Sequence, residues 1–134
     1  MDTENPQSIL LVEDEPVLQR TLFRSLQVRR YDVLAVGSAA EAITETAERQ
    51  FGVILLDVNL PDATGWDVLR ALRARAEPTP VIVLSAAPPN PDRVREFRPS
   101  GVLLKPFPID ALLHLIGATG AAPEREPQAA REVW

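Results

Sequence analysis

The sequence predicts a single α/β domain in which helices cover both faces of a parallel β-sheet. Five short apolar runs recur along the chain, and stretches with helical periodicity separate them. These runs do not alternate apolar and polar residues, so both faces of each strand must be buried, as in a parallel sheet covered by helices. The chain has 134 residues and no cysteine, so a hydrophobic core rather than disulfide bonds must stabilise it.

The predicted strands are residues 9–12, 31–36, 53–56, 81–84 and 102–104. The run at 31–36 is the most polar of the five, which favours a place at the edge of the sheet. A helix follows the first strand, because leucines recur there with a spacing of four: Leu18, Leu22 and Leu26.

The other four helices are indicated by their start signals. The second and third each begin with a capping box, in which a hydroxyl and an acidic side chain satisfy free N–H groups: Ser38 with Glu41, and Thr64 with Asp67. The fourth must fit between Pro91 and Pro99, with Asn90 as its cap and Pro91 in its first turn. The fifth begins at Ile109 and ends near residue 116.

Composition divides the chain into a short extension at residues 1–7, a domain at 8–117 and a flexible tail or linker at 118–134, which lacks an apolar period.

The net charge of −5, from 14 basic and 19 acidic residues, argues against direct nucleic-acid binding. No apolar run approaches the roughly 20 residues that a membrane span needs, and the polar N-terminus is not a signal peptide. We therefore expect a cytoplasmic protein without membrane insertion.

Chemically useful side chains follow four of the five predicted strands. Glu13 and Asp14 follow the first strand, Asp57 the third, Ser85 the fourth, and Lys105, the only lysine, the fifth. The carboxyl ends of parallel strands meet at one edge of a sheet, which is where ligands bind in such folds. We therefore expect these five side chains to lie at one site.

This set of side chains is suited to phosphoryl transfer. Three carboxylates repel one another unless a cation lies between them, and a hard dication such as Mg²⁺ prefers oxygen ligands. A carboxylate can attack phosphorus while the dication and Lys105 neutralise the developing charge. Taken singly, each residue is better explained as a cap or turn residue, as we interpret Asp62, but the combination favours one reaction.

The motifs that carry these residues resemble the receiver domain of two-component response regulators. The resemblance covers residues 8–117 and rests on four segments in the family's order: residues 9–16, 53–61 with Gly65, 83–86 and 103–107. It implies a three-layer, flavodoxin-like (βα)₅ fold with strand order 2-1-3-4-5. It also implies that the Lys105–Pro106 peptide bond is cis, which X-Pro bonds allow at a cost of about 0.5–1 kcal/mol.

The resemblance also implies the roles of the site residues. Asp57 would accept a phosphoryl group from a histidine kinase, a histidine phosphotransfer protein or a small phosphodonor. Asp14 and Asp57 would ligate Mg²⁺ directly, Glu13 through water, and Asn59 through its backbone carbonyl. Two further side chains, Ser85 and Lys105, would contact the phosphoryl group. The protein would be a signalling domain that catalyses only its own phosphorylation and dephosphorylation, with an unknown output partner.

Three departures from the family's pattern concern the output rather than the acidic site. The segment between Ser85 and Lys105, which contains four prolines, is about two residues shorter than in the family. Arg30 stands where the family often has glycine before the second strand, and Leu103 stands where we expect an aromatic residue in the fifth. Two alternatives therefore remain: a pseudo-receiver that binds proteins without phosphorylation, and a small metal-dependent phosphohydrolase. The complete set of site residues argues against the first, and the sequence offers no separate acid/base group for the second.

Overall fold

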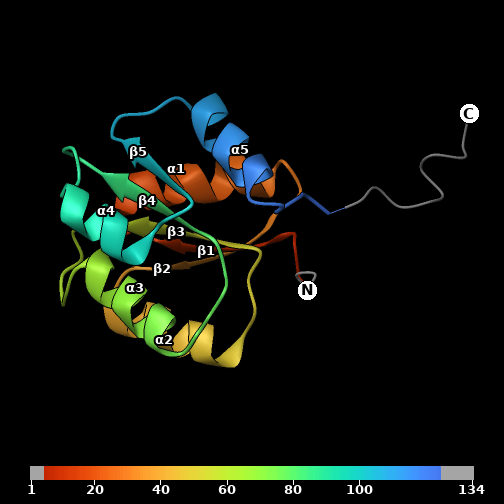
Figure 1. The fold of residues 1–134 in the computed structure, drawn as a ribbon. Helices are drawn as coiled ribbons and strands as arrows, with labels where there is room; N and C mark the ends of the chain where they lie inside the picture. Colours follow the sequence, from red (N-terminus) through yellow and green to blue (C-terminus); the bar gives the residue numbers. More distant parts are fainter. Residues whose placement is uncertain (1–4, 125–134) are drawn as a thin grey trace, which may run out of the picture.

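The computed structural model describes residues 5–124, which form one five-stranded parallel sheet with the strand order β2-β1-β3-β4-β5. The strands are β1 (Ser8–Val12), β2 (Asp32–Val36), β3 (Val53–Asp57), β4 (Val81–Ser85) and β5 (Gly101–Leu104). Figure 1 shows the sheet at the centre of the molecule, between two layers of helices. The predicted fold class and strand order are therefore confirmed.

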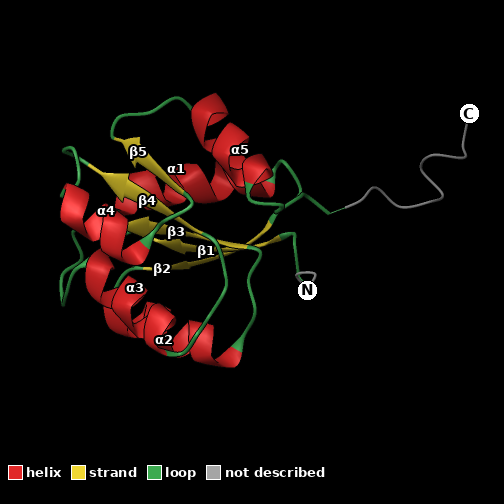
Figure 2. Cartoon of the chain, in the orientation of Figure 1, coloured by secondary structure: helices red, strands yellow, loops and turns green. Residues whose placement is uncertain are grey.

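The helices are α1 (Pro16–Gln27), α2 (Ala39–Glu48), α3 (Gly65–Ala74), α4 (Pro91–Phe97) and α5 (Ile109–Ala118). Helices α1 and α5 cover one face of the sheet, and α2, α3 and α4 cover the other (Figure 2). None of the helices in the described residues is long and apolar enough to cross a membrane.

The hydrophobic core consists of two clusters, one on each face of the sheet. Every residue of β1, β3 and β4 is buried, and alternate residues of each strand point to opposite clusters. For example, Leu10 packs with Leu69 and Leu72 of α3, whereas Leu11 packs with Leu26 of α1. Strand β2 is only partly buried, as expected for the edge. The full burial of the central strands holds their carboxyl ends in fixed positions.

The helix start signals are confirmed. Ser38 accepts a hydrogen bond from the backbone N–H of Glu41, and Thr64 and Asp67 form a complete capping box. Asn90 caps the seven-residue helix α4. Arg30, at the position where glycine was expected, has a φ of 72°, the left-handed conformation that glycine adopts at lower cost.

The described structure extends beyond residue 117, the predicted domain end. Helix α5 continues to Ala118, and Ala121 is buried against the core. The backbone N–H of Ala122 donates to the carbonyl of Pro6, and that of Glu124 donates to the carbonyl of Arg30. Residues 121–124 and the end of the predicted extension therefore pack on the domain. The rest of the predicted tail and extension, residues 125–134 and 1–4, lies outside the described residues.

The side chains of β5 divide between the two faces of the sheet. Leu103 packs on the α1 and α5 side of the sheet, whereas Val102 packs on the opposite side. Val102 and Leu104 line a shallow pocket with Pro88 and Val94 of the segment that contains α4. Since alternate strand residues point to opposite faces, the β5 residues that contact this segment are Val102 and Leu104, whereas Leu103 is packed on the other face.

Candidate functional site

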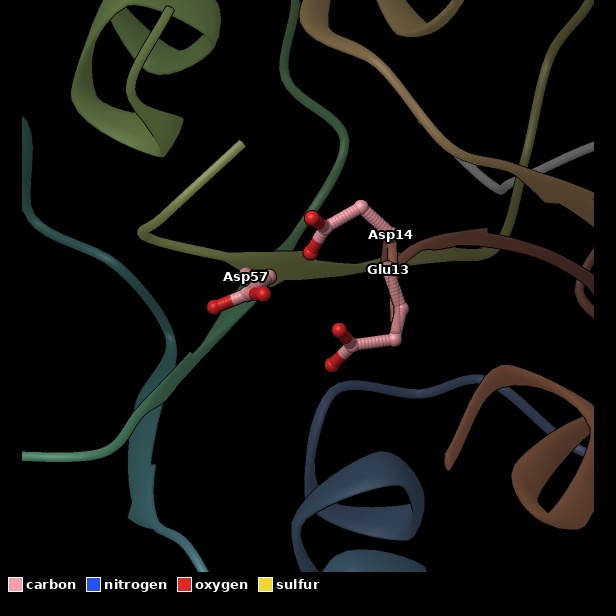
Figure 3. A group of neighbouring side chains, drawn as sticks. All are labelled: Glu13, Asp14 and Asp57. Atoms are coloured by element: carbon pink, nitrogen blue, oxygen red, sulfur yellow. The ribbon is translucent and has the colours of Figure 1, made fainter. Parts of the chain in front are cut away.

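The predicted site lies at the carboxyl edge of the sheet, where three strands bring four charged side chains together. Glu13 and Asp14 directly follow β1, Asp57 is the last residue of β3, and Lys105 directly follows β5. Residues Val12 and Leu56 are partners in the register of β1 and β3, so the residues that follow each of them are neighbours. Figure 3 shows the carboxylates of Glu13 and Asp14 extending from adjacent residues toward the side on which Asp57 lies.

The three carboxylates form a compact cluster. One oxygen from each of Glu13, Asp14 and Asp57 lies within 4.8 Å of the others, so a single small cation can be held among the three carboxylates. Glu13 and Asp57 are buried, whereas Asp14 is exposed. Because the two buried carboxylates have lost most of their hydration, the cluster requires a positive charge nearby.

Lys105 supplies a positive charge to the two buried carboxylates. Its Nζ lies 2.7 Å from Glu13 Oε1 and 3.3 Å from Asp57 Oδ2. Burial raises the pKa of Glu13 above its ordinary value, against the opposing effects of Lys105 and the backbone N–H of Glu15. Burial also acts to lower the pKa of Lys105, but Glu13 and Asp57 outweigh it, so this pKa is raised. The Lys105 ammonium therefore stays charged, whereas burial disfavours the charged form of Glu13.

Asp57 is held at the end of β3 by backbone contacts on both sides. The N–H of Val58 donates to Leu84 of β4, and the N–H of Gly65 donates to the carbonyl of Val58 at 2.8 Å. Asp57 Oδ1 accepts a hydrogen bond of 3.2 Å from the N–H of Asn59. A Cβ at Gly65 would lie 2.5 Å from the carbonyl oxygen of Asp57, which explains the glycine at the start of α3.

Ser85 and Asn59 lie at the same edge, but neither side chain completes the cluster. The Ser85 hydroxyl donates to the carbonyl of Ala87 at 2.5 Å and accepts a hydrogen bond of 3.3 Å from the N–H of the same residue. Asn59 is exposed in the loop after β3. The structure therefore brings together Glu13, Asp14, Asp57 and Lys105, and it turns Ser85 toward its own loop. The Lys105–Pro106 peptide bond is cis, as expected.

Two residues that support the site were missed or misinterpreted in the sequence. Gln19 of α1 donates from Nε2 to the carbonyls of Glu13 and Val36, at 2.7 and 3.2 Å. Asp62, which we interpreted as a turn residue, accepts hydrogen bonds from two backbone N–H groups at the start of α2. Asp62 follows a proline, as aspartates in many turns do, so its sequence context does not reveal the contact with α2. No sequence pattern indicates the role of Gln19.

An apolar pocket adjoins the site on the side of Lys105. Side chains of α1 and of the segment between β5 and α5 line it: Leu18, Thr21, Leu22, Ser25, Lys105, Pro106, Phe107 and Ile109. The lysine that contacts Asp57 therefore also borders a hydrophobic surface on which another molecule could pack.

Known proteins with similar sequences are regulatory proteins. Residues 9–117 match the family model described as the response regulator receiver domain. The transcriptional regulatory protein KdpE of Mycobacterium tuberculosis (strain ATCC 25618 / H37Rv) is 36% identical over 126 residues, which cover 89% of this chain and 55% of KdpE. The uncharacterized transcriptional regulatory protein YkoG of Bacillus subtilis (strain 168) is 38% identical over 112 residues, which cover 82% and 49%. The chain spans about half the length of these relatives.

Solved structures agree with this assignment. One is the receiver domain of the sensor histidine kinase PA1611 from Pseudomonas aeruginosa PAO1, which was solved with a magnesium ion coordinated in the active site cleft. It is 28% identical to this chain with a TM-score of 0.77, and the match covers 85% of this chain and 98% of that chain. The non-phosphorylated HemR receiver domain from Leptospira biflexa is 26% identical, also with a TM-score of 0.77, and covers 90% and 98%. Since the family model matches residues 9–117, the chain belongs to the response regulator receiver domain family.

Proposed function

We propose that Asp57 is the phosphoacceptor of this receiver domain. The observation that carries the proposal is the position of its carboxylate: Asp57 is buried, lies within the acidic cluster and has Oδ2 3.3 Å from the Lys105 ammonium. The donor would be a phosphohistidine of a histidine kinase or a histidine phosphotransfer protein, or a small phosphodonor. The unit that carries out this reaction is residues 8–117.

The acidic cluster fits a magnesium ion. Its three carboxylates lie within 4.8 Å of one another, and they are the hard oxygen ligands that Mg²⁺ prefers. We assign direct contacts to Asp14 and Asp57, a water-mediated contact to Glu13, and a backbone carbonyl contact to Asn59. When bound, Mg²⁺ supplies positive charge to the phosphoryl oxygens as negative charge builds up there.

The transfer uses the side chains of this chain in defined roles. An oxygen of Asp57 attacks phosphorus while the bond from phosphorus to the donor histidine nitrogen breaks. With a proton on its other ring nitrogen, the donor leaves as a neutral imidazole. The Lys105 ammonium already lies 3.3 Å from Asp57 Oδ2, so it can pair with the negative charge of a phosphoryl group attached to Asp57. The Ser85 hydroxyl exchanges the carbonyl of Ala87 for a phosphoryl oxygen. Water attack on the same phosphorus returns the free carboxylate.

The phosphodonor protein would pack on the apolar pocket beside Lys105. That pocket lies between α1 and the segment after β5, and its lining includes Leu18, Leu22 and Phe107. A helix packed there would bring a phosphohistidine to the edge of the sheet next to Lys105. A cytoplasmic location and an output partner that recognises the phosphorylated state are part of the same proposal.

Incubation with acetyl phosphate and Mg²⁺ tests the proposal. We expect one phosphoryl group per chain, detected by the increase in intact mass and mapped to Asp57 by peptide mass spectrometry. Asp57→Asn keeps the shape of the side chain but removes the nucleophilic charge, so it should abolish incorporation. Asp32→Asn is the matched control, because Asp32 is exposed at the opposite end of the sheet. Phosphate on any other residue would contradict the assignment.

The same assay separates the alternatives. A pseudo-receiver would incorporate no phosphate, although its acidic residues are present. A phosphohydrolase would consume acetyl phosphate continuously without retaining a phosphoryl group. The buried contact between Lys105 and Asp57 favours a retained aspartyl phosphate, because the ammonium stabilises the added negative charge.

A further inference from the structure

The loop that follows the phosphoacceptor is fastened to a helix that comes before it in the chain. Asp62 lies in this loop, residues 58–64, and its two carboxylate oxygens accept hydrogen bonds from Ala39 and Ala40 at the start of α2, each 2.9 Å long. These backbone N–H groups belong to the first turn of a helix, where no carbonyl within the helix can accept from them. A carboxylate is the strongest acceptor available to such groups, and the helix dipole favours its charge.

The start of α2 also has its own local cap, which serves a different N–H group. Ser38 Oγ accepts from the N–H of Glu41, and the Glu41 carboxylate accepts from the Ser38 hydroxyl and from the N–H of Gly37. The two caps therefore have different roles. Ser38 and Glu41 form a local cap that stabilises the start of α2, whereas Asp62 joins α2 to the phosphoacceptor loop.

Glu13, which follows β1, is also hydrogen-bonded to the segment that leads into α2. The N–H of Glu13 donates to the carbonyl of Val36, and Gln19 Nε2 donates to the carbonyls of both Glu13 and Val36. Residues 36–40, which connect β2 to α2, thus hold Glu13 through Val36 and hold the phosphoacceptor loop through Asp62. The β1 part of the acidic cluster and the loop after Asp57 are therefore both hydrogen-bonded to the segment 36–40.

The loop also makes backbone contacts of its own. Gly65 N–H bonds to Val58 at its base, Leu60 N–H bonds to Ala63 at 3.3 Å, and Asn59 pairs with Thr64 within the loop. Asn59 and Asp62 are both exposed, so packing does little to position them. Leu60 and Ala63 pack partly against the hydrophobic core, and the two bonds from Asp62 add a polar connection between the tip of this loop and α2.

We propose that Asp62 is a positioning residue for the phosphorylation site. By capping α2 it holds the loop that carries Asn59 at a fixed distance from Glu13 and Asp14, so the ligands on β1 and β3 are in place before a cation arrives. This inference rests on the proposed function, because it concerns the cation and the phosphoryl group of the same site. It adds a residue that contacts neither of them.

Variants at residues 62 and 41 test the proposal. Asp62→Ala removes the cap that joins the loop to α2, and Glu41→Ala removes a local cap of the same helix. We expect Asp62→Ala to bind Mg²⁺ about 10-fold more weakly than wild type in calorimetry, the low end of the effect of groups that orient metal ligands. Glu41→Ala should keep the wild-type affinity although its stability falls. Asp62→Asn should lie between, since it keeps an acceptor at only one of the two oxygen positions and loses the negative charge.

Amide NMR gives a readout that is independent of phosphorylation. In Asp62→Ala the amide signals of Ala39 and Ala40 should shift and exchange faster with solvent, and those of residues 58–64 should lose the Mg²⁺-dependent shifts that wild type shows. If Asp62→Ala is too unstable, Asp62→Asn is compared by the same criteria. Equal Mg²⁺ affinity in wild type and the folded Asp62 variant would overturn this inference alone. Failure of wild type to bind Mg²⁺ or accept phosphate would overturn the proposed function as well.

Discussion

Gly65 offers a direct test of how tightly the phosphoacceptor is packed. Helix α3 begins at this residue, and its backbone lies against that of Asp57. A Cβ placed on Gly65 would be 2.5 Å from the carbonyl oxygen of Asp57 and 3.1 Å from the Cα of Val58. Since these are backbone atoms, no side-chain rotation can relieve the contact. In Gly65→Ala the start of α3 must therefore move away from β3 by at least about 0.5 Å.

The expected magnitude follows from two opposing effects. Alanine is favoured over glycine in a helix by up to about 1 kcal/mol, and by less at the first residue. Overpacking in a dense region costs about 1–3 kcal/mol, and here it acts on buried backbone. We therefore expect Gly65→Ala to lower the free energy of unfolding by about 1–2 kcal/mol. The rate of phosphate incorporation should fall too, because the displaced backbone is that of Asp57.

Gly117→Ala is the matched control. Gly117 lies in α5, and a Cβ there would meet nothing within 4 Å, so this variant should be more stable than wild type by about 0.5–1 kcal/mol. Urea unfolding followed by circular dichroism measures both changes at one temperature. If Gly65→Ala proves as stable as wild type, the steric argument is refuted, because the helix preference would then have outweighed the clash.

Three other predictions concern the site and its surroundings. Mg²⁺ at 10 times its Kd should stabilise wild type by about 1.4 kcal/mol, and Asp14→Ala should lose this gain; equal thermal shifts would contradict the shared site. The hydrogen bonds from Ala39 and Ala40 lower the pKa of Asp62 below its ordinary 3.8, so its contribution to stability is complete above that pH and lost as the pH falls through the lowered value. The urea midpoints of wild type and Asp62→Asn should therefore differ at pH 7 and converge as the pH falls through the lowered pKa of Asp62. A phosphoryl mimic should change hydrogen exchange mainly in residues 86–98, and a change confined to 102–104 would contradict this.

The charged site was predictable because its residues sit at the ends of strands. Continuous apolar runs indicated strands buried on both faces, and such strands are parallel, so the residues after them meet at one edge. The three carboxylates do lie within 4.8 Å of one another, and Lys105 forms ion pairs with Glu13 and Asp57. The strand order came from the resemblance to receiver domains, since the pattern of apolar runs does not say which strand lies beside which.

The supporting contacts were not predictable in the same way. Asp62 caps a helix 22 and 23 residues earlier in the chain, and Gln19 bonds to Val36, 17 residues later. A carboxylate after a proline has the same local pattern whether it ends a turn or caps a distant helix. The faces of Val102 and Leu103 were not predictable either, because a shift of one residue in a short apolar strand moves a side chain to the other side of the sheet.

Helix α4 rather than β5 should respond to phosphorylation because its two ends are held differently. At its C-terminal end, Trp66 stacks on Phe97 with ring centroids 6.3 Å apart, and Arg73 Nε donates to the carbonyl of Phe97 at 3.1 Å. At its N-terminal end, the loop after β4 is held by the hydrogen bonds between Ser85 and Ala87 and borders only a shallow pocket against β5. If Ser85 turns to a phosphoryl oxygen, those bonds break and only that end is released. We therefore expect α4 to tilt about Phe97, with exchange increasing most in residues 86–91.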